Sequence, residues 1–151
     1  MGLCSECGAP MDPRSCDDLF HALLALDHSQ QAPWGPLHGV SVSCFVLQHP
    51  SWHPADDGAM GWALLRAYLE GGLGEVNQLV GQARRGNSHR VKARPSRFVR
   101  DAALPHWDAL PSRFSVTIED VAVDGTFPAA GFAERVKAWA AATVDAWSRR
   151  A

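Results

Sequence analysis

The sequence predicts a mainly α-helical protein, a small bundle of about five helices that follows an N-terminal cysteine-rich loop. Three observations support this prediction. Apolar residues recur at helical spacing in most segments, glycines and prolines separate these segments, and three of the four cysteines lie within the first sixteen residues. At 151 residues, with 46% hydrophobic and 20% charged residues, the chain has the length and composition of a single globular domain, residues 1–151.

The first two predicted helices form a hairpin. Residues 1–15 are rich in glycine and proline and show no apolar period, so they are expected to form a loop. Ser15 is a suitable N-cap for a helix over 16–28, in which leucines recur at helical spacing. After a loop over 29–36, a second helix is expected over 36–48, although its apolar composition also suits a buried strand.

A third helix is expected to begin at Asp56 or Asp57 and to end at the glycines of 71–74, and a fourth covers 75–85. The third helix is expected to bury the side chains of Met60, Leu64, Leu65, Tyr68 and Leu69. The last helix, over 130–149, is indicated by one apolar stripe along its length, made of Phe132, Val136, Trp139, Thr143 and Trp147.

Two further segments are expected to lack helices. Residues 84–113 form a predicted basic loop, because seven of the fourteen Lys and Arg residues fall between Arg84 and Arg100 among helix breakers. Residues 112–123 alternate apolar and polar side chains, which predicts a short strand or an extended crossing, most strongly over 113–121.

The N-terminal cysteines have the spacing of a metal site. Cys4 and Cys7 form a Cys-x-x-Cys knuckle, which presents two thiolates to one ion, and Gly8 permits the tight turn that follows. Cys16, at the start of the first helix, is placed to supply a third thiolate. Thiolate and imidazole ligands favour Zn²⁺, so residues 1–15 are predicted to be a zinc-binding knuckle.

The fourth ligand follows from the hairpin. Antiparallel helices bring the end of the second back to the start of the first, so His49 is predicted to lie beside Cys16, with His53 and then His21 as the alternatives. His38 stands roughly 16 Å from His49 along one helix, and it cannot bind the same ion. A site that uses His38 would be a second site, with Asp27 or His28.

Other roles for the four cysteines remain open: a redox pair at Cys4 and Cys7, two disulfides, or free thiols. Cys44 lies in an apolar segment and is expected to be a small core residue. The N-terminus lacks the pattern of a signal peptide and no segment is apolar enough to span a bilayer, so the expected location is the cytoplasm, where thiols stay reduced.

These motifs resemble an uncharacterised family of small bacterial proteins, a domain of unknown function. Its first block is Cys-x-x-Cys-Gly with a further cysteine before a leucine-rich helix, matched here by Cys4, Cys7, Gly8 and Cys16. A second block contains a histidine and ends in Gln-His-Pro, matched by His38 and residues 48–50, and a C-terminal helix carries tryptophans. The chain departs from this pattern at Gly39, where many members have a basic residue or histidine, and it lacks a histidine around 61–64. The resemblance implies no activity.

Three functions are compatible with these observations. The first, which we favour, is a helical zinc-binding protein whose metal is mainly structural and which serves as a binding or accessory module for an unknown protein or small molecule. The second is a metal-dependent enzyme, with a catalytic zinc or a separate polar site around His38. The third is binding of nucleic acid or phosphate through 84–100, although the net charge of −2 and the breakers in this segment favour a solvated loop.

Overall fold

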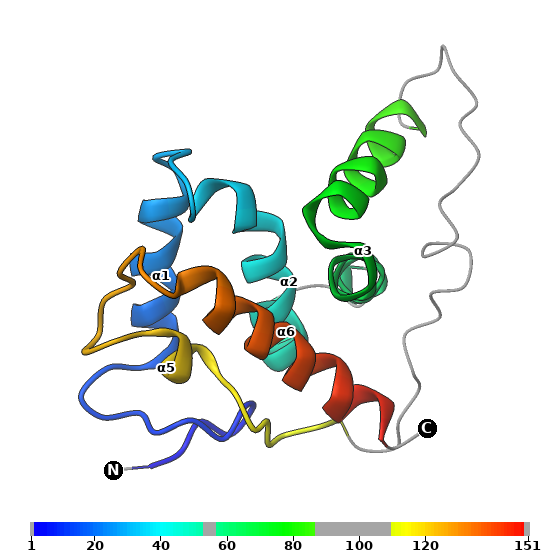
Figure 1. Ribbon diagram of the computed structural model, residues 1–151. Helices are drawn as coiled ribbons and strands as arrows, with labels where there is room; N and C mark the ends of the chain where they lie inside the picture. Colours follow the sequence, from blue (N-terminus) through cyan, green and yellow to red (C-terminus); the bar gives the residue numbers. More distant parts are fainter. Residues whose placement is uncertain (1, 53–56, 87–109, 150–151) are drawn as a thin grey trace.

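The computed structural model describes residues 2–52, 57–86 and 110–149, and it is mainly helical, as predicted (Figure 1). Within these residues there is no β-strand, and the only β-pairing is at isolated bridges. The α-helices in this part of the chain are α1 (Cys16–Asp27), α2 (His38–Gln48), α3 (Asp57–Gly86), α5 (Ile118–Val121) and α6 (Phe132–Ser148). None of the helices in the described part of the chain has the length and apolarity needed to cross a membrane.

The predicted hairpin of the first two helices is confirmed. Ser15 caps α1 through a reciprocal capping box with Asp18, in which each side chain accepts from the other residue's backbone N–H. A 3₁₀ turn, Gly35–Leu37, leads into α2, so the α-helix begins two residues after the expected start at Pro36. The segment that also suited a strand is helical, and its buried faces include Cys44, Phe45 and Leu47.

The third and fourth predicted helices form the two halves of α3. The chain passes between them at Gly72, whose φ of 74° and ψ of −163° are not helical and require glycine. Figure 1 shows the second half leaving in a different direction from the first. Leu64 and Leu65 are buried as expected, but Met60 is 42% exposed, because the buried face at this end of the helix passes through Trp62 and Ala63 instead.

Of the two alternatives for residues 112–123, the strand is wrong, and a crossing segment fits the structure. Residues 110–117 cross the bundle without regular secondary structure, and α5 then forms one helical turn. A second capping box, between Thr117 and Asp120, starts that turn. Local hydrogen bonding to the backbone therefore outweighs the alternating pattern of apolar residues.

The C-terminal helix α6 supplies the centre of the core. All five residues of its predicted apolar stripe are buried, and the helix packs against α2, α3 and α5. Gln48 joins three segments, because its Nε2 donates to the Val116 carbonyl and to Thr143 Oγ1, each at 2.9 Å. Trp147 Nε1 donates to the Leu47 carbonyl at 3.0 Å. These bonds fix the C-terminal end of α2, which precedes His49.

Most of the predicted basic loop, 84–113, falls on residues 87–109, which lie outside the described residues together with His53. Its first three residues, 84–86, are instead the end of α3.

Replacing Ser15 with alanine is expected to lower the free energy of unfolding by about 1 kcal/mol, because the substitution removes the acceptor for the Asp18 N–H at the start of α1. Urea denaturation of Ser15→Ala measures this loss. Ser15→Thr keeps a capping hydroxyl and serves as the control. An equal loss in Ser15→Thr would contradict the capping role.

Candidate metal centre

The backbone of residues 2–11 forms a tight knuckle. Its hydrogen bonds run from Cys4 N to the Ala9 carbonyl at 2.7 Å and from Gly8 N to the Cys4 carbonyl at 2.8 Å. An isolated β-bridge between Leu3 and Pro10 closes the knuckle at its base. Gly8 has a φ of 87°, which glycine adopts without strain, and this turn brings the side chains of Cys4 and Cys7 to the same side.

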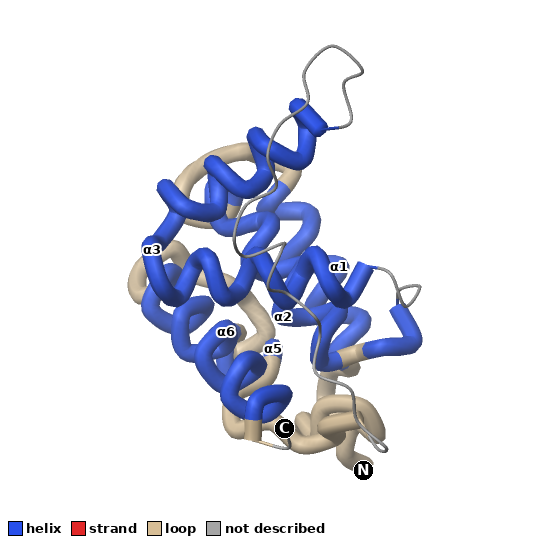
Figure 2. Tube along the Cα trace, turned by 90° about the vertical axis from the view of Figure 1, so that its right-hand side faces the viewer, coloured by secondary structure: helices blue, strands red, loops and turns tan. Residues whose placement is uncertain are grey.

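The knuckle is held against the rest of the protein by two further segments. Phe114 N donates to the Cys7 carbonyl at 3.2 Å, which attaches the crossing segment 110–117. The short 3₁₀ helix Pro50–Trp52 contacts it from the other side, since Ser51 N and Oγ donate to the two carboxylate oxygens of Glu6 at 2.9 and 3.0 Å. The knuckle therefore lies where three segments meet, at one end of the helical bundle (Figure 2).

Cys16 is the first residue of α1, and its side chain is buried against the knuckle. Its Sγ lies 3.6 Å from Sγ of Cys7. A disulfide needs about 2.05 Å between the two sulfurs, whereas two thiolates bound at about 2.3 Å to one tetrahedral zinc ion lie about 3.8 Å apart. The spacing therefore excludes a disulfide and is close to that of two ligands of one metal ion.

His49 follows the C-terminal end of α2 and is 1% exposed. Its Nδ1 lies 2.9 Å from the Phe45 carbonyl, which only accepts, so in the neutral ring Nδ1 carries the proton and Nε2 carries the lone pair. The ring stacks on Phe45 with centroids 4.0 Å apart. Nε2 is buried and has no hydrogen-bond partner among the described residues. A buried imidazole nitrogen with a fixed lone pair and no donor is ready to bind a metal ion.

These four side chains converge on one point. The ligand atoms of Cys4, Cys7, Cys16 and His49 all lie within 4.8 Å of one another and are buried. The prediction that His49 lies beside Cys16 is confirmed, and the antiparallel arrangement of α1 and α2 is the reason. Three sulfurs and one imidazole nitrogen at this spacing match the donor set that zinc prefers in closed, tetrahedral sites.

The charges of the cluster also favour a cation. The hydrogen bond with Cys16 lowers the pKa of Cys7 far below that of an ordinary thiol, and the same bond, together with burial, raises the pKa of Cys16. The protein alone therefore stabilises one thiolate but opposes a second beside it. A divalent cation would remove that opposition, because it neutralises the thiolates that bind it.

The remaining candidates lie elsewhere. His21 is exposed, with its ring centroid 5.7 Å from that of Trp52, and it does not join the cluster. Cys44 is fully buried in the core, as predicted, and burial raises its pKa. His38 lies at the other end of the hairpin, where its Nδ1 is 2.9 Å from Oδ2 of Asp27.

Sequence reasoning missed the residues that support the cluster. Glu6, inside the Cys-x-x-Cys motif, binds Ser51, and Asp17 accepts from Trp52 Nε1 at 3.0 Å. The ring of Phe45 stacks against that of His49 on one side and against that of Phe20 on the other, with the Phe45 and Phe20 centroids 3.9 Å apart. The only signal for Phe45 in the sequence is its spacing of four residues from His49, which places the two on one face of α2.

A model of a family of unknown function, DUF5946, matches residues 2–148. No curated protein and no solved structure gives a significant match. The matched range includes the whole cysteine and histidine cluster and every helix described above. The chain therefore belongs to the DUF5946 family.

Proposed function

We propose that the protein is a small zinc-binding helical protein in which the metal is structural, and that it acts as a binding or accessory module. The observation that carries this proposal is the cluster itself: a ring nitrogen of His49 and three cysteine sulfurs lie within 4.8 Å of one another, and the buried Nε2 of His49 has no hydrogen-bond partner among the described residues. Cys4, Cys7, Cys16 and His49 would be the four ligands.

The ligand set favours a structural role over a catalytic one. A catalytic zinc keeps one position open for water, whereas four protein ligands complete the tetrahedron. Three thiolates also leave the bound zinc with a net negative charge, and this weakens its ability to polarise a substrate. The four ligands would then serve to hold together the segments of the chain that carry them.

The segments around the cluster explain why a metal is needed there. The knuckle contributes few apolar side chains to the core: Cys7 and Ala9 are buried, but Leu3 and Met11 are 57% and 40% exposed. Apolar burial alone therefore gives this segment little stability. A zinc ion bound to Cys4, Cys7, Cys16 and His49 would fasten the knuckle to the start of α1 and the end of α2.

Elemental analysis of protein purified without added metal tests the proposal. We expect about one zinc ion per chain. Thiol titration of the native protein should be slow, and addition of a chelator should expose three thiols while Cys44, buried in the core, stays slow and serves as the internal control. Zinc-free protein whose thiols all titrate freely would contradict the proposal.

A further inference from the structure

The cysteine and histidine cluster borders a pocket at the surface of the protein. The pocket has a volume of about 280 Å³, and its lining includes Cys4, Cys16 and His49 but not Cys7. Met11, which is 40% exposed, lines it as well. A solute as small as hydrogen peroxide that enters this pocket therefore meets three of the four proposed zinc ligands.

Two sulfurs of the cluster are already in contact. Sγ of Cys7 and Sγ of Cys16 are 3.6 Å apart, about 1.5 Å more than the length of an S–S bond. Both cysteines are buried, but they belong to different segments, Cys7 to the knuckle and Cys16 to the start of α1. A bond between these two sulfurs would join two of the segments that a bound zinc ion would hold together.

We propose that the cluster is redox-sensitive, and that hydrogen peroxide converts the zinc site into a disulfide between Cys7 and Cys16. This inference rests on the proposed zinc site and concerns its regulation. The reduced form holds zinc through all four ligands. The oxidised form releases the ion, because Cys4 and His49 alone leave half of the tetrahedral shell without protein ligands. The knuckle stays attached to α1 in both forms.

The conversion is a two-electron oxidation. Cys16 lines the pocket, so its thiolate attacks one oxygen of hydrogen peroxide, the O–O bond breaks, and a sulfenic acid and a hydroxide ion form. The thiolate of Cys7, 3.6 Å away, then attacks the oxidised sulfur, forms the S–S bond and displaces a second hydroxide ion. Two thiolates are oxidised, one peroxide is reduced, and two protons from the solvent convert the hydroxide ions to water.

An attack on Cys4 leads to the same bridge. As a residue, Cys4 is partly exposed, whereas Cys7 and Cys16 are buried, so peroxide also reaches it. The Cys16 thiolate lies within 4.8 Å and captures the sulfenic acid of Cys4 with loss of hydroxide. The neighbouring Cys7 thiolate then attacks Cys16 in that disulfide, and the thiolate of Cys4 leaves. Both routes end with Cys4 as a free thiol.

Hydrogen peroxide added to the full-length, zinc-loaded protein tests this inference. We expect release of about one zinc ion per chain, measured with a chromophoric indicator, and recovery of the zinc site after addition of a thiol reductant and zinc. After alkylation of the free thiols, cleavage at Glu6 and Arg14 places Cys4, Cys7 and Cys16 on separate peptides. Mass spectrometry should then find Cys7 linked to Cys16 and Cys4 alkylated. A bridge that includes Cys4 would overturn the inference.

Met11→Leu is the control for oxidation of the other sulfur in the pocket. Met11 lines the pocket and is exposed, and peroxide converts a methionine thioether to a sulfoxide. The leucine variant should release as much zinc as the wild type, because the cysteines alone are responsible. A smaller release would contradict the inference, since it would assign the loss of zinc to the methionine.

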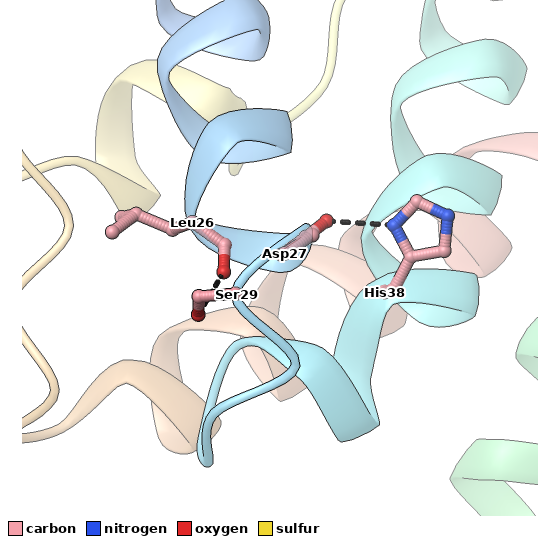
Figure 3. A network of polar contacts seen from close by, with 4 residues as sticks. All are labelled: Leu26, Asp27, Ser29 and His38. Carbon is pink, nitrogen blue, oxygen red and sulfur yellow. Dashed lines mark hydrogen bonds and ion pairs between the residues drawn. The ribbon is translucent and has the colours of Figure 1, made fainter.

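His38→Gln is the control for zinc bound away from the cluster. His38 lies at the other end of the hairpin, where its Nδ1 is hydrogen-bonded to Asp27 (Figure 3). Its side chain is 53% exposed, so its imidazole is accessible to loosely bound ions. The glutamine variant should contain and release the same amount of zinc as the wild type. A smaller release would place the released ion outside the cluster and overturn the inference.

The zinc proposal and the redox inference fail in different ways. Protein that contains no zinc as purified contradicts the zinc proposal before any peroxide is added. Protein that contains zinc but keeps it in peroxide, with no bridge between Cys7 and Cys16, contradicts the redox inference alone.

Discussion

Serine in place of Cys7 is expected to abolish tight zinc binding and to lower the midpoint of thermal unfolding by roughly 10 °C. Cys7 is fully buried, and its Sγ lies 3.6 Å from Sγ of Cys16 in the centre of the cluster. A ligand that binds only the folded protein at about a thousand times its dissociation constant contributes about 4 kcal/mol to the free energy of unfolding. Loss of the zinc removes that contribution.

Zinc content and thermal unfolding, measured on the same preparations, check this prediction. Cys44→Ala is the matched control, because Cys44 is equally buried but lies outside the cluster. It should keep its zinc and lose only about 1 kcal/mol, as is usual for a single substitution. A Cys7→Ser protein that retains full zinc, or a Cys44→Ala protein that loses it, would contradict the assignment of the ligands.

Alanine in place of Phe45 is expected to reduce both the stability of the fold and the affinity for zinc. Phe45 is fully buried and lies between Phe20 and His49, with ring centroids 3.9 and 4.0 Å away. Removing a buried aromatic ring costs about 3–5 kcal/mol. The cavity would also leave the His49 ring without its stacking partner, so Nε2 would no longer be held at the sulfurs.

Trp139→Ala is the control that separates the effect of Phe45 on stability from its effect on zinc affinity. Trp139 is also fully buried but lies in the middle of α6, and it is not among the cluster residues. We expect a comparable loss of about 3–5 kcal/mol in denaturant unfolding but unchanged zinc affinity, measured by competition with a chromophoric chelator. Phe45→Leu, which fills much of the space without a flat ring, should keep most of the stability and still bind zinc more weakly. The coupling would be refuted if zinc affinity followed stability equally in all three variants.

Much of this site was predictable because its determinants are local or follow from a simple topology. The pair of cysteines in the knuckle is a sequence motif, and Ser15 marks the start of α1, which fixes the position of Cys16. The placement of His49 needed only one assumption, that two helices joined by a short loop run antiparallel. The same assumption brought His38 to the end of the hairpin where Asp27 lies.

The features that escaped prediction depend on contacts between distant segments or on competing local signals. Nothing near Glu6 in the sequence indicates that its carboxylate binds Ser51, because 45 residues separate them. Of the two alternatives for 112–123, a strand or an extended crossing, the strand is wrong, because the capping box of Thr117 and Asp120 competes with the apolar alternation. The glycines at 71, 72 and 74, by contrast, did mark the boundary between two helical segments, since Gly72 has a non-helical backbone between the two halves of α3.

X-ray absorption spectroscopy at the zinc edge, on protein purified without added metal, tests the central claim most directly. We expect a four-coordinate zinc with three sulfur ligands at about 2.3 Å and one nitrogen ligand at about 2.0 Å. In His49→Ala, the signal of the histidine nitrogen should disappear from the spectrum, or the protein should lose its zinc. His21→Ala should leave the spectrum unchanged. A zinc shell made only of oxygen and nitrogen, or protein that contains no metal, would rule out zinc bound by Cys4, Cys7, Cys16 and His49.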